Sequence, residues 1–423
     1  MKICNYREID SSFFNNISFS TIGSVNDIID DVKINGDKAV LKYSEQFGDG
    51  KIKNIKVSED EIKKAYETVS EKTKSAIKIA VKNVGDFAQQ QLNCIKKLDT
   101  VVGGVRLGHR IIPIETVGCY IPGGNYPLPS SAVMTIVPAK TAGVKKIIAC
   151  SPKIQDATIV ACDMAGADEI YRVGGVQGIA AMAYGTNTIT KVDKIVGPGN
   201  KYVTAAKKQV YGDCGIDFLA GPSEVLIIAD ETANPFFVAA DMLAQCEHDK
   251  DARAYLICFS QEFAEEVEKE AQNILKTLQT ADIATISFKK SLAIVVDSIE
   301  KAIELSETRA PEHLEICFRN AEKCIDKFKN YGSLFIGNDS AEVFGDYCAG
   351  TNHTLPTNKV SRYSGGLSVF DYIKIQTYQS VDEKSVSFLS ETASVIAETE
   401  GLFAHKCAAE IRNQKFIQSC EHQ

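Results

Sequence analysis

Between Gly118 and Pro222 the chain alternates short apolar runs with alanine-rich stretches, and this alternation restricts the possible folds more than any other feature. The apolar runs include KKIIAC, DEIYRVGG and DKIVGPGN. Apolar runs that alternate with helical stretches are typical of parallel strands joined by crossover helices. We therefore expect residues 118–222 to form an α/β domain.

A second series of strand-like runs follows, interleaved with helices: EVLIIAD, AYLICFS, SLAIVVDS, HLEICF and SLFIG. These runs predict a second α/β sheet. The first hundred or so residues have a helical pattern, with a capping box at Ser58 and Glu61, and the last fifty or so are mostly helical without a strong strand signal. We expect four parts: an N-terminal segment (1–24), a discontinuous α/β domain (25–117 with 223–367), the middle α/β domain (118–222) and a helical C-terminal tail (368–423).

Composition narrows the class of partner. The 423 residues carry a net charge of −8, which argues against nucleic acid or an anionic membrane surface. Thirteen cysteines occur without a CxxC pair, and no N-terminal apolar stretch is typical of a signal peptide. No apolar run reaches the length of about eighteen residues that a membrane span needs. We expect a cytoplasmic protein with reduced thiols that acts on small molecules.

Three loops of the expected middle domain place glycine where an apolar strand meets a helix: CYIPGGNYPLPSSAVM, YRVGGVQGIAAMAYG and KIVGPGNKYVTAAKK. Glycine allows close backbone approach to a ligand, and helix N-termini favour phosphate. Such turns are also common without a ligand, and none is a complete GxGxxG motif. Three in one domain favour a cofactor site, with Tyr120, Gln177 and Asn200 as the polar residues that would contact the cofactor.

The stretch ANPFFVAADMLAQCEH predicts a helix that Asn234 caps and that ends in polar residues. Asp241, Gln245 and His248 then lie on one face near its C-terminal end. Carbonyl groups at that end favour a cation, and an imidazole with an amide oxygen can bind a metal. Two ligands do not make a site, so this pattern is a weak signal by itself.

Other polar residues could complete such a site. Asp346 lies in what we expect to be a glycine-flanked loop, GDYCAG, and His405 lies in the helical tail. A mixed oxygen and nitrogen donor set suits zinc or another first-row divalent ion. Glu312 and His313 stand side by side in APEHLEI, where a loop enters an expected strand. They could act as a proton-transfer pair, or as an exposed carboxylate beside a structural histidine.

Several longer motifs together resemble the histidinol dehydrogenase family. These motifs are GPGNKYV, AGPSEVLIIAD, AQCEHDKDA, RAPEHLEI, GDYCAGTNHTLPT, SGGLSVFDYIK and EGLFAHKCAAEIR, and the resemblance extends from about residue 25 to residue 412. It implies two α/β domains with incomplete Rossmann-like parallel sheets. It also implies small helical N- and C-terminal segments in an intertwined homodimer.

The resemblance also implies roles for individual residues. The implied zinc ligands are Gln245, His248, Asp346 and His405, with His405 given to the other subunit's site. The implied substrate contacts are these ligands together with Ser223, Glu312, His313 and Glu400. The implied NAD contacts are Tyr120, Gln177 and Asn200.

The implied reaction takes L-histidinol to L-histidine with two NAD, through an aldehyde that stays bound, as the last step of histidine biosynthesis. His313 would act as general base and Glu312 would activate water, while one zinc per subunit would orient the substrate. A related enzyme acting on another polar alcohol and a zinc hydrolase remain the alternatives. Cys246 departs from the small residue expected there. A thiol could attack the aldehyde, but we expect Cys246 to pack in the core.

Overall fold

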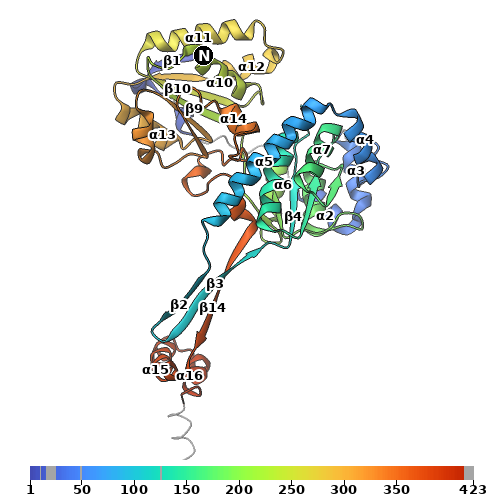
Figure 1. The fold of residues 1–423 in the computed structure, drawn as a ribbon, viewed down its shortest axis with the longest axis vertical. Helices are drawn as coiled ribbons and strands as arrows, with labels where there is room; N and C mark the ends of the chain where they lie inside the picture. Colours follow the sequence, from blue (N-terminus) through green and yellow to red (C-terminus); the bar gives the residue numbers. More distant parts are fainter. Residues whose placement is uncertain (10, 16–24, 48–49, 124–125, 414–423) are drawn as a thin grey trace, which may run out of the picture. The chain divides into compact units, whose positions relative to one another are not determined.

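The computed structural model describes residues 1–9, 11–15, 25–47, 50–123 and 126–413. The chain divides into two compact units, Met1–Leu92 with Ile114–Tyr372 and Asn93–Pro113 with Ile373–Gln423. The first unit contains two parallel sheets, and the second contains an antiparallel ribbon with two helices (Figure 1). The expectation of two α/β sheets is thereby confirmed.

The first sheet has six parallel strands. Their order is β1 (Lys2–Asn5), β11 (Leu292–Val295), β10 (Arg253–Cys258), β9 (Glu224–Ala229), β12 (His313–Cys317) and β13 (Ser333–Ile336). One face packs against α10 (Pro235–Cys246), α11 (Gln261–Leu275) and α12 (Ala281–Phe288), and the other against α1 (Ser11–Phe14) and α13 (Ile299–Arg309). The four-residue strand β1 is too short to show an alternating pattern, so the sequence did not reveal that the N-terminal segment joins this sheet.

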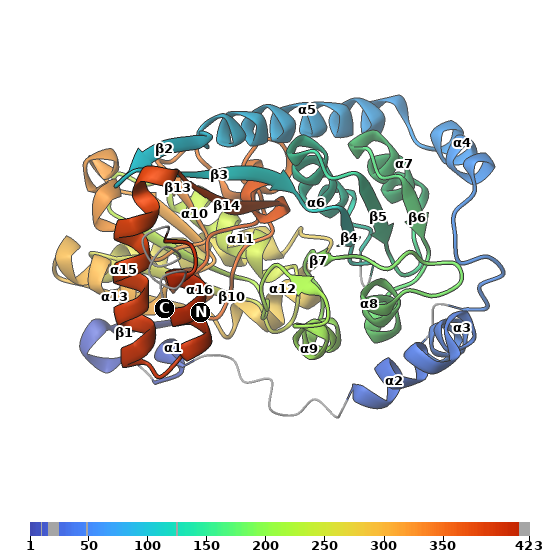
Figure 2. The same ribbon diagram turned by 90° about the horizontal axis from the view of Figure 1, so that it is seen from below.

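The second sheet has five parallel strands. Their order is β6 (Glu169–Tyr171), β5 (Lys146–Cys150), β4 (Thr116–Tyr120), β7 (Lys194–Val196) and β8 (Gly215–Ile216). Figure 2 shows α6 (Pro129–Ala142) and α7 (Asp156–Ala165) on one face, and α8 (Gly175–Tyr184) and α9 (Lys201–Val210) on the other. The strands and helices of this sheet run from Thr116 to Ile216, where the apolar alternation predicts parallel strands joined by helices.

The N-terminal helices pack against the helices that cover the second sheet. The helices are α2 (Asn26–Asn35), α3 (Asp37–Gln46), α4 (Glu59–Thr68) and α5 (Glu71–Asn93). Ile29, Val32 and Val40 share one buried core with Ile179 of α8, whereas the expected division grouped residues 25–117 with 223–367. An amphipathic pattern shows that a helix buries one face but not which partner covers it. The expected capping box is present, since Ser58 Oγ accepts the amide of Glu61 at 3.3 Å.

The second unit is built around a three-stranded antiparallel sheet. Its order is β14 (Ile373–Val381), β3 (Val105–Pro113) and β2 (Leu98–Val102), followed in the chain by α15 (Glu383–Thr399) and α16 (Phe403–Glu410). The C-terminal tail therefore contains a nine-residue strand that the sequence did not reveal. Most residues of β14 are exposed, and its apolar and polar residues alternate only over residues 373–376, so the strand signal is weak. Across the parts of the chain that the structure describes, we find no helix whose length and apolarity suit a bilayer crossing.

Candidate active site

The helix α10 places Gln245 in the interior. It begins as expected, because Asn234 Oδ1 accepts the amide of Phe236 at 3.0 Å and Pro235 occupies the first turn. Gln245 is fully buried, and neither its Oε1 nor its Nε2 has a hydrogen-bond partner among the described residues. Buried amide groups are rarely left in this state, so the side chain is suited to a ligand. His248 follows in the turn beyond the helix and is exposed.

A short helix brings two further carboxylates to this point. In α14 (Glu342–Tyr347), Glu342 and Asp346 are four residues apart and both buried. One ligand atom from each of His248, Glu342 and Asp346 lies within 4.8 Å of the others. Asp346 is therefore on a helix and not in the loop that the sequence predicted. Glu342 is not among the site residues expected from the sequence, although the i, i+4 spacing in EVFGD would place it beside Asp346 if this stretch were taken as helical.

The turn after α13 positions Glu312 and His313, called the catalytic pair below for the role expected of them. Ala310 adopts a left-handed conformation (φ 50°) that ends the helix, and the chain enters β12 at His313. His313 Nδ1 lies 3.1 Å from the backbone oxygen of Glu224, and its Nε2 lies 3.7 Å from Asp346 Oδ1. Because a carbonyl only accepts, Nδ1 carries a proton, and Nε2 is the nitrogen that faces the metal-binding group.

Both members of the catalytic pair are buried, which excludes an exposed carboxylate. Glu312 Oε2 accepts the backbone amide of Glu224 at 2.8 Å and lies 3.7 Å from His313 Nδ1. Burial raises the pKa of Glu312 to about 8. Burial opposes the charged form of His313, but the carboxylates of Glu342, Glu312 and Asp346 together raise its pKa well above the ordinary value. Perturbed acid and base groups of this kind are common at catalytic centres.

Cys246 takes the place in the core that is expected for it. Cys246 is fully buried in the core between α10 and the six-stranded sheet, and burial raises the pKa of its thiol. It therefore packs as a small core residue. Burial raises the pKa of Asp241 to about 6, and this carboxylate interacts electrostatically with the buried Glu315 of β12. Ser223 is half-buried directly before β9.

The three residues expected to contact a cofactor lie at or after the carboxyl ends of strands of the five-stranded sheet. Tyr120 ends β4, Gln177 lies in the first turn of α8 after β6, and Asn200 caps α9 after β7 by accepting the amide of Tyr202 at 3.0 Å. The carboxyl ends of parallel strands meet at one edge, where α/β proteins bind ligands. Gln177 Oε1 is buried without a hydrogen-bond partner among the described residues. Two positions of the first glycine loop, 124 and 125, lie outside the described residues.

A buried ion pair fixes the third glycine loop. Gly197 has a left-handed conformation (φ 116°), and a Cβ there would lie 2.1 Å from the backbone oxygen of Tyr120. Its amide donates to Asp217 Oδ2 at 2.7 Å and its carbonyl accepts from Lys207 Nζ at 2.9 Å. Lys207 and Asp217 are also paired with each other and are almost fully buried. This arrangement, the loop clamp, holds the backbone that leads to Asn200.

The remaining two expected site residues belong to the second unit. Glu400 follows α15 and His405 lies in α16, and both are exposed. Their expected roles stay predictions.

Comparison with known proteins identifies the family. A family model described as histidinol dehydrogenase matches residues 15–413. The chain belongs to the histidinol dehydrogenase family. The histidinol dehydrogenase of Methanocaldococcus jannaschii is 46% identical over 387 residues, which is 90% of each chain. That of Clostridium acetobutylicum is 44% identical over 397 residues, 92% of each chain.

The fold agrees with this membership. A crystal structure of histidinol dehydrogenase from Elizabethkingia anophelis is 39% identical, covers 98% of each chain and superimposes with a TM-score of 0.93. The residues of this chain also suit the groups that the resemblance implies. Gln245 offers a buried amide without a hydrogen-bond partner among the described residues, and His248 and Asp346 offer an imidazole and a carboxylate from the metal-binding group. Mixed oxygen and nitrogen donors of this kind suit a divalent ion.

Proposed function

We propose that this protein oxidises L-histidinol to L-histidine with two NAD, through an aldehyde that stays bound. The observation that carries the proposal is the position of His313 in the first unit. Its Nδ1 is fixed by the Glu224 carbonyl, while its Nε2 has no hydrogen-bond partner among the described residues and lies 3.7 Å from a carboxylate suited to metal binding. Two successive oxidations at one carbon need a base that can be used repeatedly.

We assign the zinc ligands as Gln245, His248, Asp346 and the partner subunit's His405. Zinc, when bound, would supply a fixed point for the substrate's nitrogen donors, and NAD would accept the hydride. Ser223 and Glu400 would bind other polar groups of the substrate. The cofactor would contact Tyr120, Gln177 and Asn200.

In the first oxidation, His313 Nε2 would accept the proton of the substrate alcohol. Its Nδ1–H bond to the Glu224 carbonyl holds the ring in one orientation and supports the charge that develops on the imidazole. Glu342 and Glu312 lie 3.5 and 3.7 Å from Nδ1 and stabilise the same charge. Fixed charges in a buried site need no reorganisation during the reaction.

In the second oxidation, Glu312 would accept a proton from water as it adds to the aldehyde, and His313 would return its proton to the aldehyde oxygen to complete the hydrate. His313 would then accept a proton of the hydrate as the second hydride leaves for NAD. Burial raises the pKa of Glu312 to about 8, which makes its carboxylate a stronger base than one in solvent. The Glu224 amide holds Oε2 of Glu312, so Oε1 is the oxygen that would face water.

A homodimer is part of the proposal. Several large apolar side chains of α15 and α16, and of the turn between them, are at least two-fifths exposed: Phe388, Val395, Ile396, Leu402 and Phe403. These side chains, here called the tail surface, come from two helices that pack against each other and from the turn between them. Exposed apolar side chains gathered on one element pair favour a protein–protein interface. A second copy of the chain would cover the tail surface and would bring His405 and Glu400 to the neighbouring site.

One assay tests the reaction. The purified protein is incubated with histidinol, NAD and zinc, and NADH formed is counted per histidinol consumed. Two NADH per substrate is expected, and one would indicate an alcohol dehydrogenase that stops at the aldehyde. No NADH together with ester or amide hydrolysis would replace the proposal by a zinc hydrolase. Chelation should abolish the activity, and added zinc should restore it.

A further inference from the structure

One residue supports both members of the catalytic pair through its main chain. The amide of Glu224 donates to Glu312 Oε2 at 2.8 Å, and its carbonyl lies 3.1 Å from His313 Nδ1. Glu224 begins β9, which pairs directly with β12 on one side and with β10 on the other. The orientation of both catalytic side chains therefore depends on the position of this one peptide.

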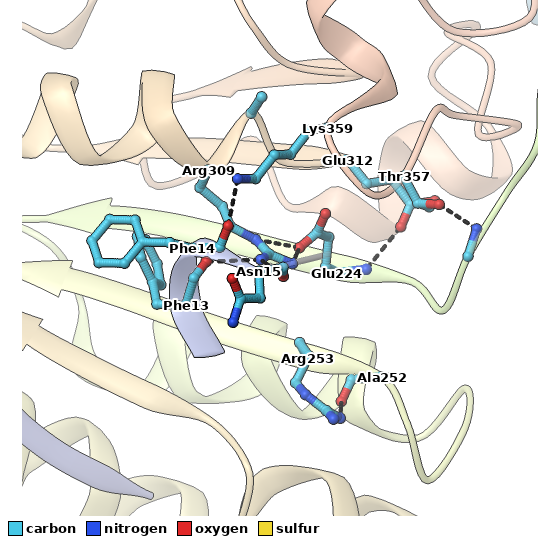
Figure 3. A network of polar contacts seen from close by, with 12 residues as sticks. Phe13, Phe14, Asn15, Glu224, Ala252, Arg253, Arg309, Glu312, Thr357 and Lys359 are labelled. Atoms are coloured by element: carbon cyan, nitrogen blue, oxygen red, sulfur yellow. Dashed lines mark hydrogen bonds and ion pairs between the residues drawn. The ribbon is translucent and has the colours of Figure 1, made fainter. Parts of the chain in front are cut away.

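The side chain of Glu224 is held in turn by Arg309. Arg309 ends α13, is only 1% exposed, and donates its Nε to Glu224 Oε2 at 2.7 Å, with a second contact from Nη2. Figure 3 shows the guanidinium lying against this carboxylate. The guanidinium carbon also lies 4.9 Å from the centre of the Tyr255 ring on β10. A buried guanidinium with several fixed partners has little freedom to move.

The same guanidinium also binds the N-terminal segment. Its Nη1 donates to the backbone oxygens of Phe13 at 2.9 Å and Asn15 at 3.3 Å, and Lys359 Nζ donates to the oxygen of Phe14 at 2.5 Å (Figure 3). These three carbonyls lie at the end of α1, where a helix leaves its acceptors unsatisfied. The buried Phe13 ring packs edge-on against Tyr255.

We propose that Arg309 and Glu224 are positioning residues for the catalytic pair, and that through Arg309 the N-terminal segment helps to hold Glu312 and His313 in place. The proposal rests on the proposed function for the identity of the pair. Neither residue needs to touch substrate. Their effect is on the geometry of the base and of the water-activating carboxylate, where a displacement of about 1 Å can cost about a hundredfold in rate.

The test uses the double variant Arg309→Met with Glu224→Met in the full-length protein. Removing only one partner would leave a buried charge and could prevent folding, whereas replacing both by apolar side chains of similar length is often tolerated. We expect kcat to fall by about tenfold to a hundredfold, with KM for histidinol and NAD and the zinc content little changed. Arg309→Lys, which keeps the charge facing Glu224, should recover part of kcat.

Lys359→Met is the matched control. It removes one bond to the N-terminal segment and leaves the contact between Arg309 and Glu224, so kcat should stay close to that of the unmodified protein. A folded double variant with kcat unchanged, or an equal loss in the Lys359→Met variant, would overturn the proposal.

Hydrogen exchange gives a readout independent of activity. In the double variant the backbone amide at position 224 should lose more protection than the other amides of β9, because its bond to Glu312 would loosen. Unchanged protection would also overturn the proposal. If the unmodified protein forms no NADH from histidinol, the proposed function fails, while the exchange result still decides whether Arg309 and Glu224 hold Glu312.

Discussion

At the scale of single residues, the burial of the Glu342 carboxylate next to His313 is not expected from the sequence. It is 1% exposed, its Oε1 lies 3.5 Å from His313 Nδ1, and its Oε2 has no hydrogen-bond partner among the described residues. It also belongs to the group that could hold a metal ion. Two roles are therefore chemically open to it: a metal ligand, or a charge that stabilises the imidazolium of His313.

We predict the second role. Glu342→Gln should lower kcat by about a hundredfold, because His313 would lose a nearby negative charge when it accepts a proton. The zinc bound per subunit, measured after dialysis against a weak chelator, should stay unchanged. Asp339→Asn, an exposed residue in the loop before α14, is the control and should behave like the unmodified protein. Loss of zinc in Glu342→Gln would identify Glu342 as a ligand instead.

At the scale of elements, the loop clamp makes a separate contribution. Lys207 on α9 and Asp217 after β8 together fix the amide and the carbonyl of Gly197, so the loop leading to Asn200 depends on a helix and a strand end. Lys207→Met should leave Asp217 as a buried charge without its partner and cost about 3 kcal/mol of stability.

The kinetic effect of Lys207→Met should be confined to NAD binding. At a temperature where the Lys207→Met variant is folded, KM for NAD should rise about tenfold while KM for histidinol stays unchanged, because only the loop next to Asn200 is loosened. Steady-state kinetics with each substrate varied in turn measures this. Lys208→Met, an exposed neighbour on the same helix, is the control. Equal rises in both KM values would contradict a role confined to this loop.

A second element-scale prediction concerns acid stability of the five-stranded sheet. Burial alone would raise the pKa of Glu169 on β6, but Lys56 at 2.7 Å, Tyr171 at 2.7 Å and Lys146 at 3.2 Å lower it to about 2. A carboxyl group whose pKa is lowered by folding contributes stability above its unfolded pKa and loses it as the pH falls through its folded pKa.

Glu169 should therefore contribute about 3 kcal/mol at neutral pH, and this contribution should disappear between about pH 4.5 and pH 2. Urea unfolding at several pH values should show that Glu169→Gln is less stable than the unmodified protein at pH 7 and that the difference shrinks towards pH 3. Glu115→Gln removes an exposed partner of Lys145 and should change little at any pH. A difference independent of pH would exclude this linkage.

The sequence predicted the elements in which the pattern of apolar and polar residues reflects their burial, or in which a local motif marks an end. The parallel strands of both sheets have apolar runs, the cap at Asn234 and the capping box at Ser58 are local, and burial of Cys246 follows from the helical face it occupies. The missed elements carry no such pattern: β14 is mostly exposed, β1 is four residues long, and α14 is a single short helix. The Arg309–Glu224 pair joins residues 85 positions apart, and no local pattern predicts such a contact.

At the scale of the whole molecule, the proposal divides each metal site between two copies of the chain. Gln245, His248 and Asp346 would come from one subunit and His405 from its partner. A site shared in this way can be tested without knowing the geometry of the interface. Two inactive variants can complement each other in a mixed dimer when each chain supplies the metal ligand that is substituted in the other.

We predict that His248→Ala and His405→Ala are each inactive alone and that their co-expression restores activity. In a mixed dimer, one site receives both substitutions and the other receives neither, so each mixed dimer has one intact site. With random pairing half of the dimers are mixed, and the activity should reach about a quarter of that of the unmodified protein. Tagging the two chains differently and purifying through both tags isolates the mixed dimer, which should then have about half the activity and half the tightly bound zinc.

Co-expression of His248→Ala with Gln245→Ala is the control. Both substitutions fall in the same subunit's part of the site, so no intact site can form and no recovery is expected. Recovery in the control, or none in the test pair, would show that each subunit completes its own site.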